Sequence, residues 1–181
     1  MAPMTASGSL WDLIVFYPTL WWNYLLGKVL RLRPWYTEID DVVILGAYPI
    51  ASDIIELKKK GLTGVINMCK ECTGPVECYT KEEIETLHLA TVDFEPPTFE
   101  ACLQGVAFLE KHAQQGGRVY VHCKAGRGRS ATIVLCWLMK KEGISPEEGQ
   151  ALLLKKRGHV NTHLAKRKAV LEFYQKEATT Q

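Results

Sequence analysis

Short apolar blocks alternate with longer amphipathic blocks along the chain, and this pattern predicts β-strands separated by α-helices. Blocks rich in β-branched residues predict strands at residues 42–45, 64–68, 89–94 and 118–122. Helical spacing of apolar residues predicts helices at 53–60, 81–88, 99–115, 130–141, from Ser145 to Gly158, and at 164–177. This alternation favours an α/β fold in which a central, mostly parallel sheet of four to five strands is flanked by helices.

Two of the predicted helices begin with a recognisable N-terminal signal. Thr80 and Glu83 have the spacing of a capping box, which predicts that a helix starts there and continues to residue 88. Ser145, Pro146 and Glu148 combine a capping box with a proline at the first helical position. We therefore expect both helices to begin at these residues.

Composition indicates one folded domain, at residues 37–181, preceded by an N-terminal extension at residues 1–36. The chain has 181 residues, of which 47% are hydrophobic, and a formal net charge of +2. This length suffices for a full core, and the small net charge gives no reason to expect a nucleic-acid partner. Six cysteines without regular spacing favour a reducing compartment.

The N-terminal extension is rich in aromatic residues and leucine between residues 10 and 30. Asp12, Pro18, Asn23 and Lys28 interrupt this stretch, so it does not have the pattern of a membrane-spanning helix. We expect an amphipathic helix that lies at a membrane interface or acts in targeting. The alternative is a helix that packs on the domain core.

The sequence HCKAGRGRS at residues 122–130 has the pattern of a phosphate-binding site with a nucleophile. It joins a predicted strand to the N-terminus of a predicted helix, where backbone N–H groups and the helix dipole favour an anion. The same field should lower the pKa of the Cys123 thiol and make it a nucleophile. Arg129 can hold two phosphoryl oxygens, and Ser130 can donate a hydrogen bond to the thiolate.

The residues that we expect to bind the phosphate follow the cysteine. They are Lys124, Ala125, Gly126, Arg127, Gly128 and Ser130. Lys124 and Arg127 add positive charge to that of Arg129, which favours a substrate with more negative charge than one phosphotyrosine. The alternative is that both side chains point to solvent.

These residues resemble the signature of the cysteine-dependent protein tyrosine and dual-specificity phosphatases, HCxxGxxR followed by serine or threonine. The resemblance implies the cysteine-phosphatase fold and a phosphocysteine intermediate at Cys123. It also implies that Asp93 is the acid that protonates the leaving oxygen, with Glu95 as the alternative. No metal and no organic cofactor are implied by this mechanism.

A narrower resemblance is carried by VFYPTL, ILGAYPIAS, VYVHCKAGR and VLEFYQKE, and covers most of residues 13–177. These segments are similar to the mitochondrial, protein-tyrosine-phosphatase-type phosphatidylglycerophosphatases. The resemblance implies conversion of phosphatidylglycerophosphate to phosphatidylglycerol in cardiolipin biosynthesis, on the matrix side of the mitochondrial inner membrane. We accordingly expect a monomer that associates peripherally with an anionic membrane.

Other functions and another location stay open from the sequence. The chain is alternatively a dual-specificity protein phosphatase, a phosphoinositide phosphatase with a similarly basic loop, or a phosphate-binding module without turnover. Its alternative location is the cytoplasm. The chain also departs from the family, because CKECTGP at residues 69–75 replaces an acidic, tyrosine-containing loop, and Gly128 replaces a serine.

The cysteines outside the HCKAGRGRS segment allow three interpretations. Cys69, Cys72 and Cys78 could bind zinc with His88 as a fourth ligand, although the spacing matches no common zinc module. Cys69 or Cys72 could instead form a disulfide with an oxidised Cys123. The simplest interpretation is that they are ordinary core or surface residues.

Overall fold

The computed structural model describes Pro18, Leu30 and residues 33–180 of the chain. Nearly all of the predicted N-terminal extension, residues 1–36, therefore lies outside the described residues. The division into an extension and a domain at residues 37–181 stays a prediction. Within the described part, no helix is both long enough and apolar enough to cross a membrane.

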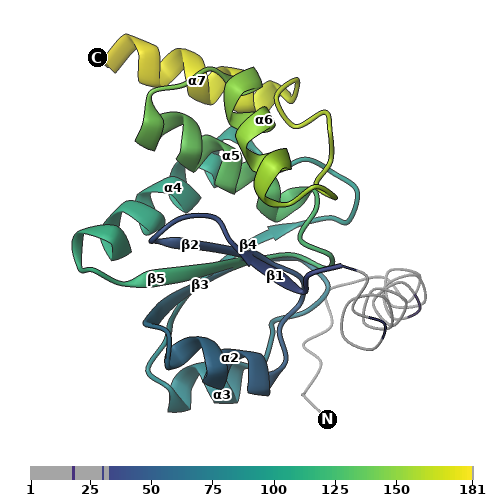
Figure 1. Ribbon diagram of the computed structural model, residues 1–181, viewed down its shortest axis with the longest axis vertical. Helices are drawn as coiled ribbons and strands as arrows, with labels where there is room; N and C mark the ends of the chain where they lie inside the picture. Colours follow the sequence, from purple (N-terminus) through teal and green to yellow (C-terminus); the bar gives the residue numbers. More distant parts are fainter. Residues whose placement is uncertain (1–17, 19–29, 31–32, 181) are drawn as a thin grey trace.

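A five-stranded sheet forms the centre of the fold (Figure 1). In spatial order its strands are β1 (Tyr36–Glu38), β2 (Val43–Gly46), β5 (Arg118–His122), β3 (Leu62–Cys69) and β4 (Glu85–Thr91). Only β1 is antiparallel to its neighbour, and the other strands pair in parallel. The carboxyl ends of β3, β4 and β5 therefore meet at the same edge of the sheet, where ligands bind in such folds.

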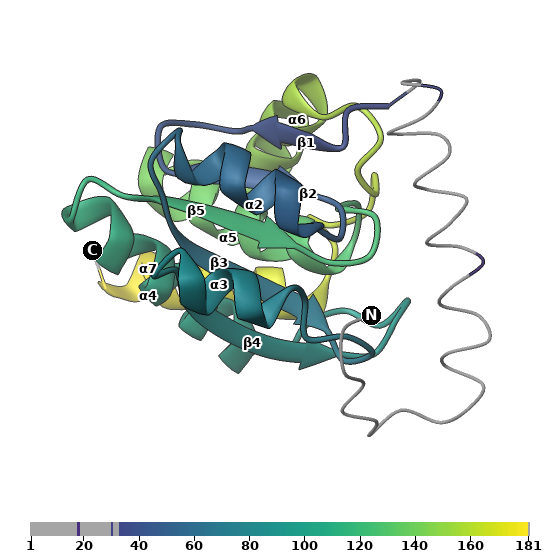
Figure 2. The same ribbon diagram turned by 90° about the horizontal axis from the view of Figure 1, so that it is seen from below.

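Helices cover both faces of the sheet (Figures 1 and 2). One face carries α2 (Ala51–Lys58) and α3 (Val76–Lys81), and the other carries α4 (Phe99–Gln114), α5 (Arg129–Glu142), α6 (Pro146–Lys156) and α7 (Lys168–Thr180). The core is divided accordingly into two clusters of buried apolar side chains. Because α5 lies between the sheet and the other helices, its residues from Arg129 to Met139 are all buried.

The predicted α/β class and the mostly parallel sheet are confirmed, and residues 118–122 form a strand with the predicted bounds. The capping box at Ser145 is also confirmed, since its hydroxyl accepts from the Glu148 N–H and the Glu148 carboxylate accepts from the Ser145 N–H. The last helix begins at Lys168 rather than at residue 164. Strand β1 was not predicted, because three residues carry too little periodicity.

The predicted helix at residues 81–88 is wrong. Helix α3 ends at Lys81, Glu83 adopts a left-handed backbone with φ of 51°, and residues 85–91 form β4. The Thr80 hydroxyl donates to the Val76 carbonyl inside α3 and does not cap a new helix. Parallel pairing with β3 overrides the local helical pattern. It gives the backbone N–H and carbonyl groups of β4 hydrogen-bond partners in the sheet.

A buried arginine ties the end of α6 to the loop that follows β5. Arg157 is 1% exposed, and its guanidinium donates to the carbonyls of Gly126 and Pro34 at 3.1 Å and to the Thr37 hydroxyl at 2.9 Å. Burial lowers the pKa of Arg157 to about 10, which still leaves it protonated at neutral pH. These bonds join three segments that are far apart in the sequence.

We expect the Arg157→Met variant to lose about 2 to 4 kcal/mol of unfolding free energy, because several buried carbonyls and a hydroxyl lose their donor. Urea denaturation measures this loss. Lys156→Met is the matched control, since Lys156 is the exposed neighbour on the same helix and should change stability by less than about 0.5 kcal/mol. Equal stability of the two variants would contradict a structural role for Arg157.

Candidate active site

The loop between β5 and α5, residues 123–128, is named the phosphate loop here. Its first residue, Cys123, follows the central strand directly and is only 4% exposed. Gly126 has a left-handed backbone with φ of 66°, and a Cβ atom there would lie 2.4 Å from the Gly46 carbonyl oxygen. Only glycine fits this turn, which folds the loop back over the N-terminus of α5.

The surroundings of Cys123 favour its thiolate form. Burial by itself raises the pKa of the thiol, but the charge of Arg129 and hydrogen bonds from Ser130 and the Ala125 backbone N–H lower it to about 7. The Ser130 hydroxyl lies 3.2 Å from Cys123 Sγ. The Cys123 thiol therefore ionises more readily than an ordinary cysteine, as the sequence predicts.

His122 precedes the nucleophile but is fully buried. Burial lowers the pKa of its imidazole to about 3, so the ring is neutral at physiological pH. Its Nδ1 atom lies 3.4 Å from the Cys123 carbonyl oxygen, and the rings of Tyr48 and Tyr120 pack against it. These contacts suit a residue that positions Cys123 and that does not exchange protons with a substrate.

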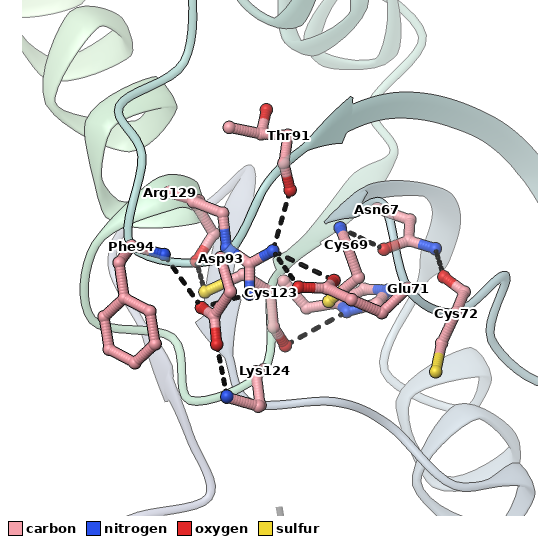
Figure 3. Close-up of polar contacts among 12 residues, drawn as sticks. Asn67, Cys69, Glu71, Cys72, Thr91, Asp93, Phe94, Cys123, Lys124 and Arg129 are labelled. Atoms are coloured by element: carbon pink, nitrogen blue, oxygen red, sulfur yellow. Dashed lines mark hydrogen bonds and ion pairs between the residues drawn. The ribbon is translucent and has the colours of Figure 1, made fainter. Parts of the chain in front are cut away.

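Arg129 is held by acceptors from three residues, which lie at the ends of β3 and β4 (Figure 3). Its Nη1 atom donates to the Thr91 carbonyl at 2.8 Å and to both carboxylate oxygens of Glu71 at 3.1 Å, and its Nη2 atom donates to Asp93 Oδ1 at 2.8 Å. The side chain is 3% exposed. The guanidinium is therefore fixed beside Cys123 in a single orientation.

Glu71 is a residue of the site that the sequence analysis did not identify. It lies in the 69–75 segment, where the chain departs from the related family, and its side chain is 6% exposed. The only signal was an acidic residue three positions after the strand predicted at residues 64–68. A carboxylate at that place is explained by the buried positive charge of Arg129, which needs a partner.

Asp93 comes to the site from the segment that follows β4. Its two carboxylate oxygens form ion pairs with Arg129 and with Lys124, whose side chain is 7% exposed. Lys124 therefore points into the site, whereas the alternative placed it in solvent. Glu95, the rival to Asp93, lines the same cavity but is exposed and forms no ion pair with a described residue.

A cavity of about 770 Å³ opens above Cys123. Besides Lys124 and Arg129, three arginines line it, namely Arg33, Arg127 and Arg167. Arg127 is exposed and its Nε atom donates to the His159 carbonyl at 2.7 Å. Arg167, which the sequence analysis did not single out, donates to the Gly128 carbonyl at 3.2 Å. The cavity therefore carries more positive charge than the phosphate loop alone provides.

The remaining cysteines are free thiols and form no cluster with metal-ligand geometry among the described residues. His88, the suggested fourth zinc ligand, instead contacts the Cys69 carbonyl oxygen at 2.7 Å. Burial raises the pKa of Cys69 well above the ordinary value and raises that of Cys72 to about 11. Both thiols are therefore protonated at neutral pH, and a disulfide with Cys123 stays a prediction.

We expect the alkylation rate of Cys123 by iodoacetamide to rise with pH with a midpoint near 7, because the thiolate is lost as pH falls through the lowered pKa. In Ser130→Ala the midpoint should rise by about half a unit to one unit, since a donor to the thiolate is removed. Mass spectrometry of the labelled peptide gives the rates. A midpoint near that of a free thiol would contradict the inferred electrostatics.

Comparison with known proteins agrees with these features. The family model of the dual specificity phosphatase catalytic domain matches residues 43–176. The phosphatidylglycerophosphate phosphatase PTPMT1 of Arabidopsis thaliana is 38% identical over 163 residues, which are 88% of this chain and 48% of that protein. The chain thus spans about half the length of this relative. The phosphatidylglycerophosphatase and protein-tyrosine phosphatase 1 of Rattus norvegicus is 37% identical, covering 91% of this chain and 90% of that protein.

Solved structures give the same result for the fold. A crystal structure of PTPMT1 superposes with a TM-score of 0.72 at 35% identity, covering 81% of this chain and 98% of that one. A complex of PTPMT1 with PI(5)P matches equally well, at 34% identity. The chain therefore belongs to the dual specificity phosphatase family, and it is a cysteine-dependent phosphatase that is similar to the phosphatidylglycerophosphatases of the PTPMT1 type.

Proposed function

We propose that this phosphatase hydrolyses the phosphomonoester of phosphatidylglycerophosphate and releases phosphatidylglycerol, a step of cardiolipin biosynthesis. The observation that carries the proposal is the positive charge of the cavity, where Arg127 and Arg167 add to the phosphate-binding Arg129. Phosphatidylglycerophosphate has a phosphodiester in addition to its phosphomonoester, so it has a second negative group for these arginines. The names of the relatives from Arabidopsis and rat support the same substrate.

In the first step, the Cys123 thiolate attacks phosphorus while Arg129 holds the phosphoryl group. An S–P bond forms and the bond from phosphorus to the glycerol oxygen breaks. Asp93 gives its proton to that oxygen, so the lipid leaves as an alcohol. Glu71 and Thr91 hold Nη1 of Arg129, and the guanidinium therefore keeps its orientation when Nη2 exchanges Asp93 for a phosphoryl oxygen.

In the second step, the Asp93 carboxylate accepts a proton from water, and the resulting hydroxide attacks the phosphocysteine. The S–P bond breaks, and inorganic phosphate leaves. The electron pair returns to sulfur, where the Ser130 hydroxyl and Arg129 stabilise the thiolate. The backbone N–H groups of the phosphate loop bind the phosphoryl oxygens in both steps.

The same proposal includes the place where the protein works. A lipid substrate requires contact with a membrane, and we infer a monomer that associates peripherally with the matrix side of the mitochondrial inner membrane. This assignment rests on the similarity to the PTPMT1 group of phosphatases. The N-terminal extension, residues 1–36, is the candidate targeting or membrane-associating segment.

We expect kcat/KM for phosphatidylglycerophosphate to exceed that for a phosphotyrosine peptide by about tenfold or more. The reason is that the lipid has a second phosphate group, which can bind Arg127 and Arg167. Release of inorganic phosphate measures both reactions. In Cys123→Ser both rates should fall by about a thousandfold or more, since the nucleophile is lost. Faster turnover of the peptide would favour a protein phosphatase, and undiminished turnover by Cys123→Ser would contradict the mechanism.

We expect Asp93→Asn to lower kcat for the lipid by about a hundredfold or more, because an amide cannot protonate the alcohol that leaves. Glu95→Gln is the matched control, since Glu95 lines the same cavity two residues away. It should change kcat by less than about threefold. The opposite order of effects would transfer the acid role to Glu95.

A further inference from the structure

Phe94 is the most exposed of the large apolar side chains in the described part of the chain. It is 83% exposed, and Val92 in the same segment is 39% exposed. Both residues flank Asp93, and Phe94 lines the cavity that contains Cys123. In Figure 3 the ring of Phe94 points away from the network of Arg129, Glu71 and Asp93. A large ring at the mouth of a polar cavity has no role in the chemistry described above.

The backbone keeps this ring outside the core. Phe94 has a φ of 68°, a left-handed conformation that is unfavourable for a bulky residue. Its N–H donates to Asp93 Oδ1 at 3.1 Å, and the Lys124 ammonium lies 5.4 Å from the centre of its ring. Residues in such conformations cluster at functional sites, where surrounding contacts maintain them. The ion pair of Asp93 with Lys124 thus helps to hold Phe94 outward.

Positive charge lines the same cavity as the exposed ring. Arg33, Arg127 and Arg167 line the same cavity mouth, and none of them pairs with a carboxylate of a described residue. Glu95 is the one exposed carboxylate among the residues that line it. An apolar projection within a basic rim complements an anionic bilayer, where aromatic rings enter the interface and arginines contact lipid phosphates.

We propose that Phe94, with Val92, inserts into the interface of an anionic lipid bilayer, while the arginines of the cavity mouth contact neighbouring headgroups. The proposal rests on the proposed function in one respect, because it assigns to the ring the delivery of a membrane lipid to Cys123. When Phe94 is inserted in this way, the mouth of the cavity faces the bilayer surface. The phosphomonoester then reaches the cavity while the acyl chains stay in the membrane.

The test compares two substitutions of Phe94 that differ in polarity and in backbone preference. Phe94→Asn removes the apolar ring but suits a positive φ, so it should not lower folding stability. Phe94→Leu keeps an apolar side chain. We expect Phe94→Asn to lower kcat/KM for phosphatidylglycerophosphate in vesicles by about five- to tenfold, because apolar burial is lost, whereas Phe94→Leu should lose less than about threefold. For a soluble aryl phosphate, both variants should stay within about twofold of the wild type.

A second measurement is independent of the substrate. Flotation of the full chain with vesicles of phosphatidylcholine and phosphatidylglycerol gives the partition coefficient, which should fall about five- to tenfold in Phe94→Asn. Ile55→Gln is the matched control, because Ile55 is 42% exposed on α2, away from the cavity, and its replacement should not change partitioning. If the wild type binds these vesicles through Phe94 but does not hydrolyse the lipid, the proposed function fails and the docking surface stands.

Three results would overturn the proposal. An equal loss of activity on vesicles and on the soluble substrate would make Phe94 a residue that positions Asp93. Unchanged vesicle turnover and unchanged partitioning in Phe94→Asn would remove any membrane role. A loss confined to a phosphotyrosine peptide would assign the ring to a peptide partner.

Discussion

A buried guanidinium beside a buried thiolate is the interaction on which the active site depends. Burial alone would keep the Cys123 thiol protonated, and it would disfavour the charged form of Arg129. Together, the two groups stabilise each other's charged forms, and Ser130 adds a hydrogen bond to the sulfur. This pairing requires the end of a central strand and the start of a central helix to meet, which explains why both are buried.

The rest of the site maintains the geometry of this pair. Glu71 and Asp93 reach Arg129 from the ends of β3 and β4, the strands that lie beside β5 on one side of the sheet. On the other side, Arg157 binds the carbonyls of the phosphate loop and of the segment before β1. The loop is therefore held from both sides, which maintains its conformation beside Arg129.

The same arrangement links the chemistry to the surface of the protein. Asp93 binds Arg129 through one oxygen and Lys124 through the other, and the next residue, Phe94, projects out of the cavity. A change at Phe94 would therefore reach Asp93 through one peptide bond.

Local sequence patterns were sufficient to predict the elements that have a regular pattern of apolar residues or carry a motif. Strand β5, the start of α6 and the loop from Cys123 to Arg129 were predicted because each carries a local signal, namely a run of β-branched residues, a capping box and the HCKAGRGRS motif. The helix expected at residues 81–88 failed despite such a signal. Its last residues pair with β3, and that pairing satisfies more backbone groups than a helix end there would.

By itself, the sequence determined the α/β class and pointed to Cys123 and Arg129 through their positions in one motif, and to Asp93 through the family resemblance. Only the tertiary structure decided that Glu71, Arg157 and Arg167 belong to the same site. These residues lie in segments without a motif, and each is brought to the loop by packing of distant elements. A buried charge needs partners, but a linear sequence does not say which segment will supply them.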